Sequence, residues 1–579
     1  MTFIPPWEKI AETKKCRISG EEFFITDKDL EFYEKISPVF AGQKYLIPTP
    51  TLCPDERQRR RLAFRNETKF YHRKCDKSGN QIISVYSPEK PYTVYDQKVW
   101  WGDDWSSYDF GRNFDFEKSF FEQFQWLQLV VPRVNLFAKN CENSEFTNHT
   151  DHIKNSYLSV DVADSENIYY SRWVLSSKSC IDCYRIEDSE LCYGSQYIIN
   201  GYAMIHCFLC HGSSHCLFCE NIRNCHECIL CYWIQGKQYH IMNKSYAPDE
   251  YAIKKMELMN MVSSNMPLLR KIFQDLIKNL PRQNLVLRNT ENVFWDMIDN
   301  SKSVFQSFDI SNGENLKYCY EATWIRDSYD VFESWFDCEQ QYECYASNRT
   351  SFSHFCTIGY DNSFNIYCDL CNNSQHCFGS IGIRKWKYSI LNHSYSIQEY
   401  ETLCGKIIEH MKSTGEWWEF FPLSLSPFGY NETVAQEHFG LTQDVAMSHG
   451  WKWKWEEETS SYHWPYYAPL SIDNYNERIV GYTIAQKNID EVLKWIIQCE
   501  ISGRPFKIIK QELLFYIENN LPLPSKHPDQ RHKERMSLRN PRTLHERDCA
   551  ECGKKTITTY VPNRSERVVC EECYRKLVY

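Results

Sequence analysis

Hydrophobic and polar positions alternate over short distances through the middle of the chain. Between residues 141 and 231, a small or polar residue precedes an aromatic, aliphatic or cysteine residue at intervals near 11 or 12. A unit of this length suits one or two short strands and their turns, whereas a helical repeat needs roughly 30 residues or more. The pattern predicts a β-solenoid-like region with Cys, Tyr and Phe in inward ladders and Asn, Ser and Asp at the corners.

A second run with similar spacing extends from residue 303 to residue 375. Tyr239-x-Ile-x-Asn-x-Ser-Tyr246 matches Tyr388-x-Ile-x-Asn-x-Ser-Tyr395 at an offset of 149 residues. The same offset places three cysteines of the first run, Cys207, Cys219 and Cys228, on Cys356, Cys368 and Cys377. We therefore expect a duplicated Cys-rich repeat array, with one copy at residues 141–250 and the other at residues 289–398.

Helical periodicity follows each array. Apolar residues recur at helical spacing from Tyr251 to Lys278 and from Glu399 to Met411. These patterns predict a helical arm at residues 251–288 and a helical and irregular linker at residues 399–488. The predicted fold is therefore mainly β with helical arms.

The two ends of the chain resemble each other. Residues 16–25 match residues 499–508 without a gap, nine extra residues then occur in the first copy, and Cys75 falls on Cys549. The match predicts two related tandems of small units, at residues 10–101 and 489–579. An aromatic and acidic linker that contains a helix is expected directly after the first tandem, at residues 102–140.

The final unit contains the strongest chemical signal in the sequence. Cys549, Cys552, Cys570 and Cys573 form a CxxC-x17-CxxC pattern. Two such turns present four thiolates to one tetrahedral zinc ion, and residues 557–569 are expected to form a hairpin. Four buried free cysteines are the alternative. About 30 residues bury too little apolar surface for stability, whereas structural zinc contributes on the order of 10 kcal/mol to folding.

The other three units retain the frame of the pattern but not its ligands. In the unit that aligns with the zinc site, Cys75 is retained, and the other three cysteines are replaced by Ser78, Asp96 and Val99. The first unit of each tandem is here called its leading unit. In the N-terminal leading unit the four positions are Cys16, Ser19, Cys53 and Glu56. In the C-terminal leading unit they are Cys499, Ser502, His527 and Gln530. Since Val cannot bind a metal and Ser rarely does, we expect an intact site only at the C-terminus.

These motifs resemble a known family. CxxxG-x2-F-x-I, EFY or LFY, a CP or HPD turn followed by Arg, and the paired CxxC motifs are similar to a functionally uncharacterised bacterial zinc-ribbon family. In that family a probable zinc-ribbon module is joined to a CxxC-x17-CxxC module. The resemblance is confined to the two ends of this chain and implies zinc-ribbon tandems, degenerate here, that flank the repeat region. It also implies binding to nucleic acid or protein.

A basic segment lies between the two units of each tandem. Its members at helical spacing are Arg57, Arg61 and Arg65, matched one for one by Arg531, Arg535 and Arg539. On a helix they form one positive face, and arginine grips phosphate through a bidentate fork. Contact with RNA or DNA is one interpretation. The alternative is a solvated or intramolecular role, which the formal net charge of −10 favours.

The 27 cysteines and the lack of an export signal indicate a reducing, cytoplasmic setting. Seven cysteines between Cys207 and Cys231 could form a buried thiol ladder, bind extra zinc or hold an iron–sulfur cluster. We favour the ladder because Cys225 and Cys231 fall on Ser374 and Ser380 in the second run. The apolar stretches are too short to span a bilayer, so no membrane partner is expected.

No catalytic signature stands out. The sequence lacks a phosphate-binding G-x4-GK[ST] loop, a dinucleotide-binding G-x-G-x2-G, a G-x-S-x-G elbow and an HExxH pair. We therefore predict a non-enzymatic, zinc-binding cytoplasmic protein that binds nucleic acid through its arginine helices. A protein-interaction scaffold is the first alternative, and a redox or metal-cluster enzyme is the second.

Overall fold

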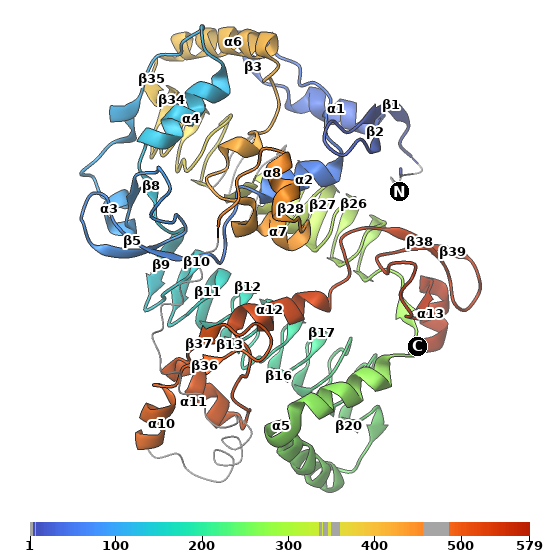
Figure 1. Cartoon of the computed structure of the whole chain (residues 1–579). Coiled ribbons are helices and arrows are strands. Elements are labelled where there is room, and N and C mark those ends of the chain that lie inside the picture. Colours follow the sequence, from blue (N-terminus) through green and yellow to red (C-terminus); the bar gives the residue numbers. More distant parts are fainter. Residues whose placement is uncertain are drawn as a thin grey trace. The chain divides into compact units, whose positions relative to one another are not determined.

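A computed structural model describes residues 4–5, 7–334, 338–339, 345–348, 359–455 and 486–578. It is mostly β-sheet with interspersed helices, which confirms the predicted fold class in outline (Figure 1). The chain divides into two compact units, Met1–Leu136 with Gln283–Trp455 and Pro541–Arg564, and Phe137–Arg282 with Glu456–Asn540 and Ser565–Tyr579. None of the described helices has the length and apolar character needed to cross a membrane.

The second unit contains a stack of short parallel strands, here named ladder 1. Its strands are β9 (Ala138–Glu142), β10 (Asn148–Lys154), β11 (Val160–Tyr169), β12 (Arg172–Leu175), β13 (Lys178–Ile181), β14 (Tyr184–Glu187), β15 (Gln196–Ile199), β16 (Tyr202–Ile205), β17 (Phe208–His211), β18 (Ser214–Leu217), β19 (His226–Ile229) and β20 (Gln238–Ile241). Paired residues are 12 positions apart, as in Tyr184↔Gln196 and Gln196↔Phe208. This register agrees with the predicted spacing of 11 or 12.

Within ladder 1 every third residue points inward. Ile186, Ser189, Cys192 and Ser195 are buried, and each follows a residue with positive φ. Such a conformation is uncommon for residues other than glycine. Inward serines contribute hydrogen bonds between successive turns of the ladder: the Ser189 hydroxyl accepts the backbone N–H of Gly201, 12 residues later, at 2.9 Å.

The predicted side-chain arrangement of the ladder is partly wrong. Serine lies inside together with Cys, Ile and Val, whereas Tyr169, Tyr193 and Phe218 join the separate hydrophobic cluster that contains helix α5 (Pro248–Ile277). The interior accepts only small or slender side chains because adjacent inward positions are close. A Cβ added at Gly201 would lie 2.3 Å from Cγ2 of Ile198.

The first unit contains a second stack, named ladder 2. Its strands are β23 (Leu287–Arg288), β24 (Glu291–Val293), β25 (Ile298–Asp299), β26 (Lys302–Phe305), β27 (Ile310–Lys317), β28 (Tyr320–Tyr329), β29 (Phe332–Ser334), β30 (Cys338–Glu339), β31 (Tyr345–Asn348), β32 (Gly359–Tyr360), β33 (Gln375–Phe378) and β34 (Lys387–Ile390). Offsets are 12 in β27–β28 and β33–β34, 11 in β23–β25 and 13 in β29–β31. Cys356 lies outside the described residues.

Both ladders end with the same series of elements. Strand β20 pairs antiparallel with β21 (Lys244–Ser245) before α5, and β34 pairs antiparallel with β35 (His393–Ser394) before α6 (Ile397–Thr414). Each of these elements begins 149 residues later in the second series, as in the sequence match. The two predicted helices are therefore confirmed. Helix α5 departs from helical geometry at Asn265, two residues before Pro267.

The terminal segments share much of their order of elements, although α10 has no N-terminal counterpart and β3 and β4 have no C-terminal one. The N-terminal series is β1 (Ile10–Lys15), β2 (Glu22–Thr26), α1 (Asp27–Ile36), β3 (Val39–Phe40), β4 (Gln43–Lys44), α2 (Pro54–Leu62), β5 (Tyr71–Lys74), β6 (Gln81–Ser84), β7 (Val94–Tyr95) and α3 (Gln97–Trp101). The C-terminal series is α10 (Gln486–Val492), β36 (Ile497–Gln498), β37 (Pro505–Phe506), α11 (Lys510–Glu518), α12 (Pro528–Ser537), β38 (His545–Asp548), β39 (Lys555–Thr558), β40 (Val568–Val569) and α13 (Glu571–Val578). Helix α11 begins 483 residues after α1, and α12, β38 and α13 begin 474 residues after α2, β5 and α3. The difference is the nine-residue insertion seen in the sequence.

The remaining elements lie outside the two ladders and the two terminal series. They are η1 (Ser107–Phe110), α4 (Phe120–Val130), β8 (Arg133–Val134), β22 (Arg282–Gln283), η2 (Leu423–Leu425), η3 (Tyr430–Glu432), α7 (Val434–His438) and α8 (Gln443–Ser448). Helix α4 is the helix expected within residues 102–140. The part of the predicted 399–488 linker between residues 456 and 485 lies outside the described residues.

Candidate metal centre

Four turns at the two ends of the chain have the same backbone hydrogen bonds. In the last, the N–H of Cys549 donates to the carbonyl of Lys554 at 2.8 Å, and the N–H of Gly553 donates to that of Cys549 at 2.9 Å. Gly553 has a φ of 73°, which favours glycine. The same pair of bonds closes the turns Cys16–Glu21, Cys75–Asn80 and Cys499–Arg504. The backbone frame is therefore retained where the metal ligands are not.

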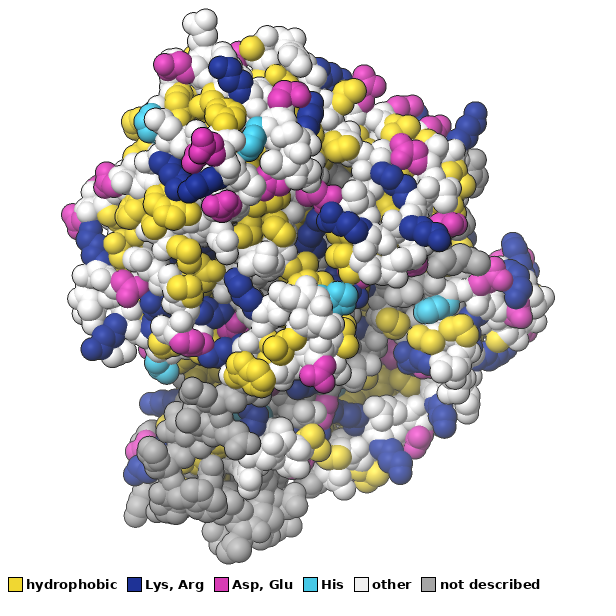
Figure 2. Space-filling model, turned by 45° about the horizontal axis from the view of Figure 1, so that its top comes forward, with side chains coloured by type: hydrophobic (Ala, Val, Ile, Leu, Met, Phe, Trp, Pro, Cys, Tyr) yellow, Lys and Arg dark blue, Asp and Glu magenta, His cyan; other side chains and the backbone are white. Residues whose placement is uncertain are grey.

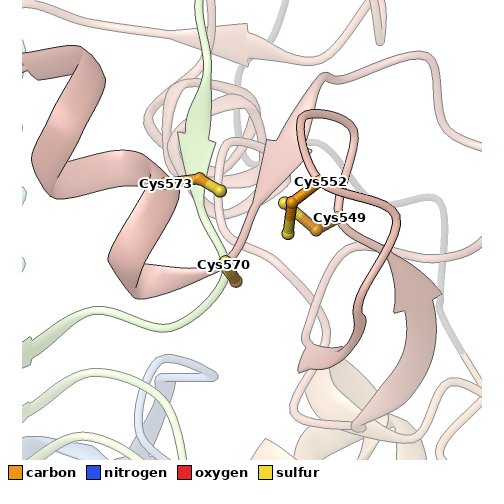
Figure 3. A group of neighbouring side chains, drawn as sticks. All are labelled: Cys549, Cys552, Cys570 and Cys573. Atoms are coloured by element: carbon orange, nitrogen blue, oxygen red, sulfur yellow. The ribbon is translucent and has the colours of Figure 1, made fainter.

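The last of these turns brings two cysteines close to two others. Cys549 and Cys552 lie between β38 and β39, while Cys570 directly precedes α13 and Cys573 lies in its first turn (Figure 3). The four sulfur atoms all lie within 4.8 Å of one another. Thiolates bound to zinc at about 2.3 Å are roughly 3.8 Å apart, so small side-chain movements would complete a tetrahedron. The cluster could bind a metal ion.

The hairpin expected over residues 557–569 is not the one that forms. Strand β39 pairs antiparallel with β38, with His545 opposite Thr558 and Asp548 opposite Lys555. The hairpin therefore encloses the first CxxC turn. Hydrogen bonds between the strands hold Cys549 and Cys552 on a tight loop, while α13 supplies Cys573 and the residue directly before α13 is Cys570.

The unit that aligns with this centre uses hydrogen bonds at the ligand positions. The Ser78 hydroxyl lies 3.3 Å from the Asp96 carboxylate, and Cys75 Sγ accepts the backbone N–H groups of both residues at 3.4 Å. Asp96 also caps α3 by accepting the N–H of Val99 at 3.0 Å. The substituted side chains thus connect the same two segments that the cysteines approach in the C-terminal unit.

The candidate ligands of the two leading units have other partners. Glu56 forms an ion pair with Arg59 at 2.6 Å, and burial raises the pKa of Cys53 to about 12, which disfavours the thiolate that binds metals. Nδ1 of His527 accepts the N–H of Asp529 and caps α12. In the described part of the chain, neither leading unit gathers three metal-ligating side chains.

The arginines on α2 are buried. Arg57 Nε and Arg61 Nη1 lie 2.9 and 3.0 Å from the same oxygen of Asp330, which follows β28. The Arg57 and Arg61 side chains are at most 1% exposed. Arg57 also donates to the carbonyl of Leu52 at 2.9 Å. Asp330 has a φ of 58°, one of the positive values that recur at every third residue of this part of ladder 2.

Helix α12 lies along ladder 1 (Figure 1), and its matching arginines contact that ladder in the same way. Arg531 pairs with one carboxylate oxygen of Asp182, and Arg535 Nη1 lies 2.7 Å from the other. Asp182 has a φ of 57° and immediately follows β13. Arg539 donates to the Tyr184 hydroxyl at 2.6 Å. Each helix is therefore joined to a ladder by one buried aspartate that receives two arginines.

The third arginine of each set lies beyond the predicted helical face. Helix α2 ends at Leu62 and α12 at Ser537, so Arg65 and Arg539 follow the helices. Arg65 is buried and pairs with Glu67 at 2.7 Å. These contacts are the intramolecular alternative that the sequence left open. On the face in Figure 2, Lys and Arg side chains are interspersed with Asp and Glu and form no continuous basic stripe.

The central cysteines are inward residues of ladder 1. Cys207, Cys219 and Cys231 follow one another at 12-residue intervals and are almost fully buried. Cys219 Sγ lies 3.5 Å from the carbonyl of Leu217 and 3.3 Å from that of Cys228, both suitable acceptors for its weak S–H donor. Serine occupies the same position in earlier turns, as at Ser171 and Ser195. These contacts support the buried thiol ladder.

Sequence reasoning found the four C-terminal cysteines but missed a second group of potential ligands, His215, His226 and Glu227. A signal was present, since His215 and Glu227 are separated by 12 residues, the spacing of the repeat. The aspartate partners of the arginines, Asp182 and Asp330, were also missed, because nothing local marks them. In comparisons with known proteins, the chain matches no family model and no curated protein.

Proposed function

We propose that the protein is a non-enzymatic, zinc-stabilised scaffold, in which the two ladders are β-solenoids that present binding surfaces to a protein partner. One observation favours this function over nucleic-acid binding. The paired arginines that could have gripped phosphate are instead buried against Asp182 and Asp330. A buried guanidinium already paired with a carboxylate has no free face for a phosphate.

Exposed aromatic side chains on ladder 2 support a protein partner. Trp324 and Trp386 are about half exposed, at 53% and 48%. Near Trp324, Arg326 is mostly exposed and lies 3.6 Å from Glu314. Tryptophan and arginine are enriched at protein interfaces and dominate their binding energy. These side chains are therefore the proposed anchors on this ladder.

The scaffold role is tested by capture from a native lysate, with one half of the sample treated with nuclease. A protein partner should remain after nuclease treatment, and W324A/W386A should release it. A partner that disappears with nuclease would support the nucleic-acid role instead. Purified protein should also show no saturable binding to RNA or duplex DNA that weakens between about 50 and 200 mM salt.

Zinc at the C-terminal cysteines is supported by four sulfur ligands, which suit zinc in a structural site. Elemental analysis should find zinc and no iron, and C552S should remove the sulfur-bound ion. Since bound zinc contributes to folding, a chelator should lower the temperature at which residues 545–578 unfold. An unchanged metal content in C552S would contradict this assignment.

A further inference from the structure

Three metal-ligating side chains lie together on the outer side of ladder 1. His215, His226 and Glu227 each offer a ligand atom, and these atoms lie within 4.8 Å of one another. His215 and Glu227 occupy equivalent corners of successive turns, with φ values of 54° and 53°. The imidazole of His226 stands edge-on to that of His215, with 5.2 Å between ring centroids. His226 and Glu227 are half-buried and His215 is exposed, so all three remain within reach of solvent.

Neighbouring groups hold two of these side chains in place. Ser214 Oγ lies 2.7 Å from Nδ1 of His226, a contact that leaves Nε2 for an ion. Lys255, on helix α5, lies 2.7 Å from Oε2 of Glu227. Metal-binding histidines and carboxylates characteristically have such hydrogen-bonded partners, which orient the ligand.

We propose that His215, His226 and Glu227 form a second metal site, which binds a divalent ion of the zinc class. Two imidazoles and one carboxylate suit Zn²⁺, and three protein ligands leave a fourth coordination position for water. The site differs in kind from the C-terminal centre because it contains no sulfur. It does not depend on the scaffold role or on zinc at the four cysteines.

A substitution of Lys255 tests the proposal through the direction in which it changes metal affinity. Its ammonium group pairs with Glu227 and would lie close to the bound cation, so the two positive charges oppose each other. K255M removes this repulsion and keeps an unbranched apolar side chain on α5. Metal affinity, measured by competition with a chromogenic chelator, should rise about fivefold in K255M. A salt bridge with no bearing on a metal would leave the affinity unchanged.

Metal content of the full chain provides the main test. Protein that has been stripped with a chelator, reloaded with Zn²⁺ and desalted should hold two ions per chain. H215A and H226A should each hold one. H152A is the matched control, because His152 lies in the same ladder but pairs with Asp151 at the surface. It should retain both ions. Circular dichroism would verify that the variants keep their strands.

Cobalt substitution separates the two sites. Cobalt at the four cysteines gives intense sulfur-to-metal charge transfer, whereas cobalt at His215, His226 and Glu227 gives only weaker ligand-field bands. C552S should lose the first signal and keep the second, and H226A should do the reverse. The proposal is overturned if C552S binds no cobalt, or if H215A and H226A both retain the second ion.

Discussion

At the scale of single residues, two aspartates determine where the arginine helices bind. Asp330 receives Arg57 and Arg61, and Asp182 receives Arg531 and Arg535. Removing such charges from water is costly, so a buried ion pair adds less to stability than its short distances suggest. Its stronger effect appears when one member is lost, because the other charges then remain buried without compensation. The aspartates therefore specify the position of each helix.

Replacing the Asp330 carboxylate tests this effect. D330N should destabilise the protein by about 3 kcal/mol, since two buried guanidinium groups would lose their shared counter-charge. Urea unfolding followed by tryptophan fluorescence would measure the change. D327N is the control, because Asp327 is half-buried and bonded to Asn315. It should change stability by less than about 0.5 kcal/mol. Equal effects of the two variants would contradict the assignment.

A half-buried histidine makes ladder 1 sensitive to acid. Burial holds the pKa of His206 well below its usual value, and the nearby Arg270 guanidinium lowers it further. Nε2 of His206 lies 2.9 Å from the sulfur of Met266, and its ring stacks on Phe218. Gly194 permits this packing, since a Cβ there would lie 2.5 Å from the imidazole. The imidazole is therefore neutral in the folded protein.

Because the unfolded chain takes up this proton near pH 6.5 and the folded chain does not, acid favours unfolding. His206 should reduce the free energy of unfolding by up to about 1.4 kcal/mol per pH unit as the pH falls below 6.5. H206F should lose that part of the slope, while H152Q should keep it. The measurement is a series of urea unfolding curves between pH 7.5 and about 5. Identical slopes in H206F and the wild type would refute the prediction.

At the scale of elements, serine and cysteine are not equivalent inside the ladders. Ser165, Ser177 and Ser189 each accept the backbone N–H of the residue 12 positions later, at 3.0, 3.1 and 2.9 Å. A thiol is a weaker acceptor but a larger apolar group. Serine thus satisfies the backbone of a tight turn, whereas cysteine fills its interior. This division explains why both residues recur at inward positions.

Substitutions of Ser189 distinguish the contribution of hydrogen bonding from that of filling the interior. S189A should lower the free energy of unfolding by about 2 kcal/mol, because the buried N–H of Gly201 loses its acceptor. S189C should cost less than S189A if the thiol accepts part of that bond. The comparison is made by thermal unfolding of both variants and the wild type. A greater loss in S189C would indicate that space, rather than hydrogen bonding, limits this position.

At the scale of the whole molecule, each unit is built from segments distant in sequence. The α2 helix near the N-terminus packs with ladder 2, and the α12 helix near the C-terminus packs with ladder 1. Arg57 and Asp330 are separated by 273 residues, and Arg531 and Asp182 by 349. Contacts so distant in sequence close large loops, which slows folding.

This connectivity predicts which ladder responds to which end of the chain. R57M/R61M should increase hydrogen exchange of the amides in β28 and β29 about tenfold or more and leave β14 and β15 nearly unchanged. R531M/R535M should have the reverse effect. Hydrogen-exchange mass spectrometry of the full chain resolves these peptides. An equal increase in amide hydrogen exchange in both ladders, in either variant, would contradict the division into units.

Sequence predicted the parts better than their contacts. Repeated turns, paired cysteines and helical periodicity are local signals. They predicted the turns at Cys549 and Cys75, the C-terminal cluster, and helices α5 and α6. The arginine sites did not, because a positive face looks the same whether its partner is a phosphate or a distant carboxylate such as Asp330. The inward serines were also missed. Serine is common at corners, and its use as an acceptor inside a ladder depends on the 12-residue register.

The ladder geometry limits how this protein can change length. Its inward residues recur every three positions, and its strands pair at a 12-residue offset in ladder 1. An insertion or deletion that is not a multiple of three would turn an inward side chain outward and leave a polar or bulky one inside. One that is a multiple of three but not of twelve would shift every later residue out of the 12-residue pairing register of ladder 1. Evolutionary growth or loss within ladder 1 should therefore proceed by whole turns.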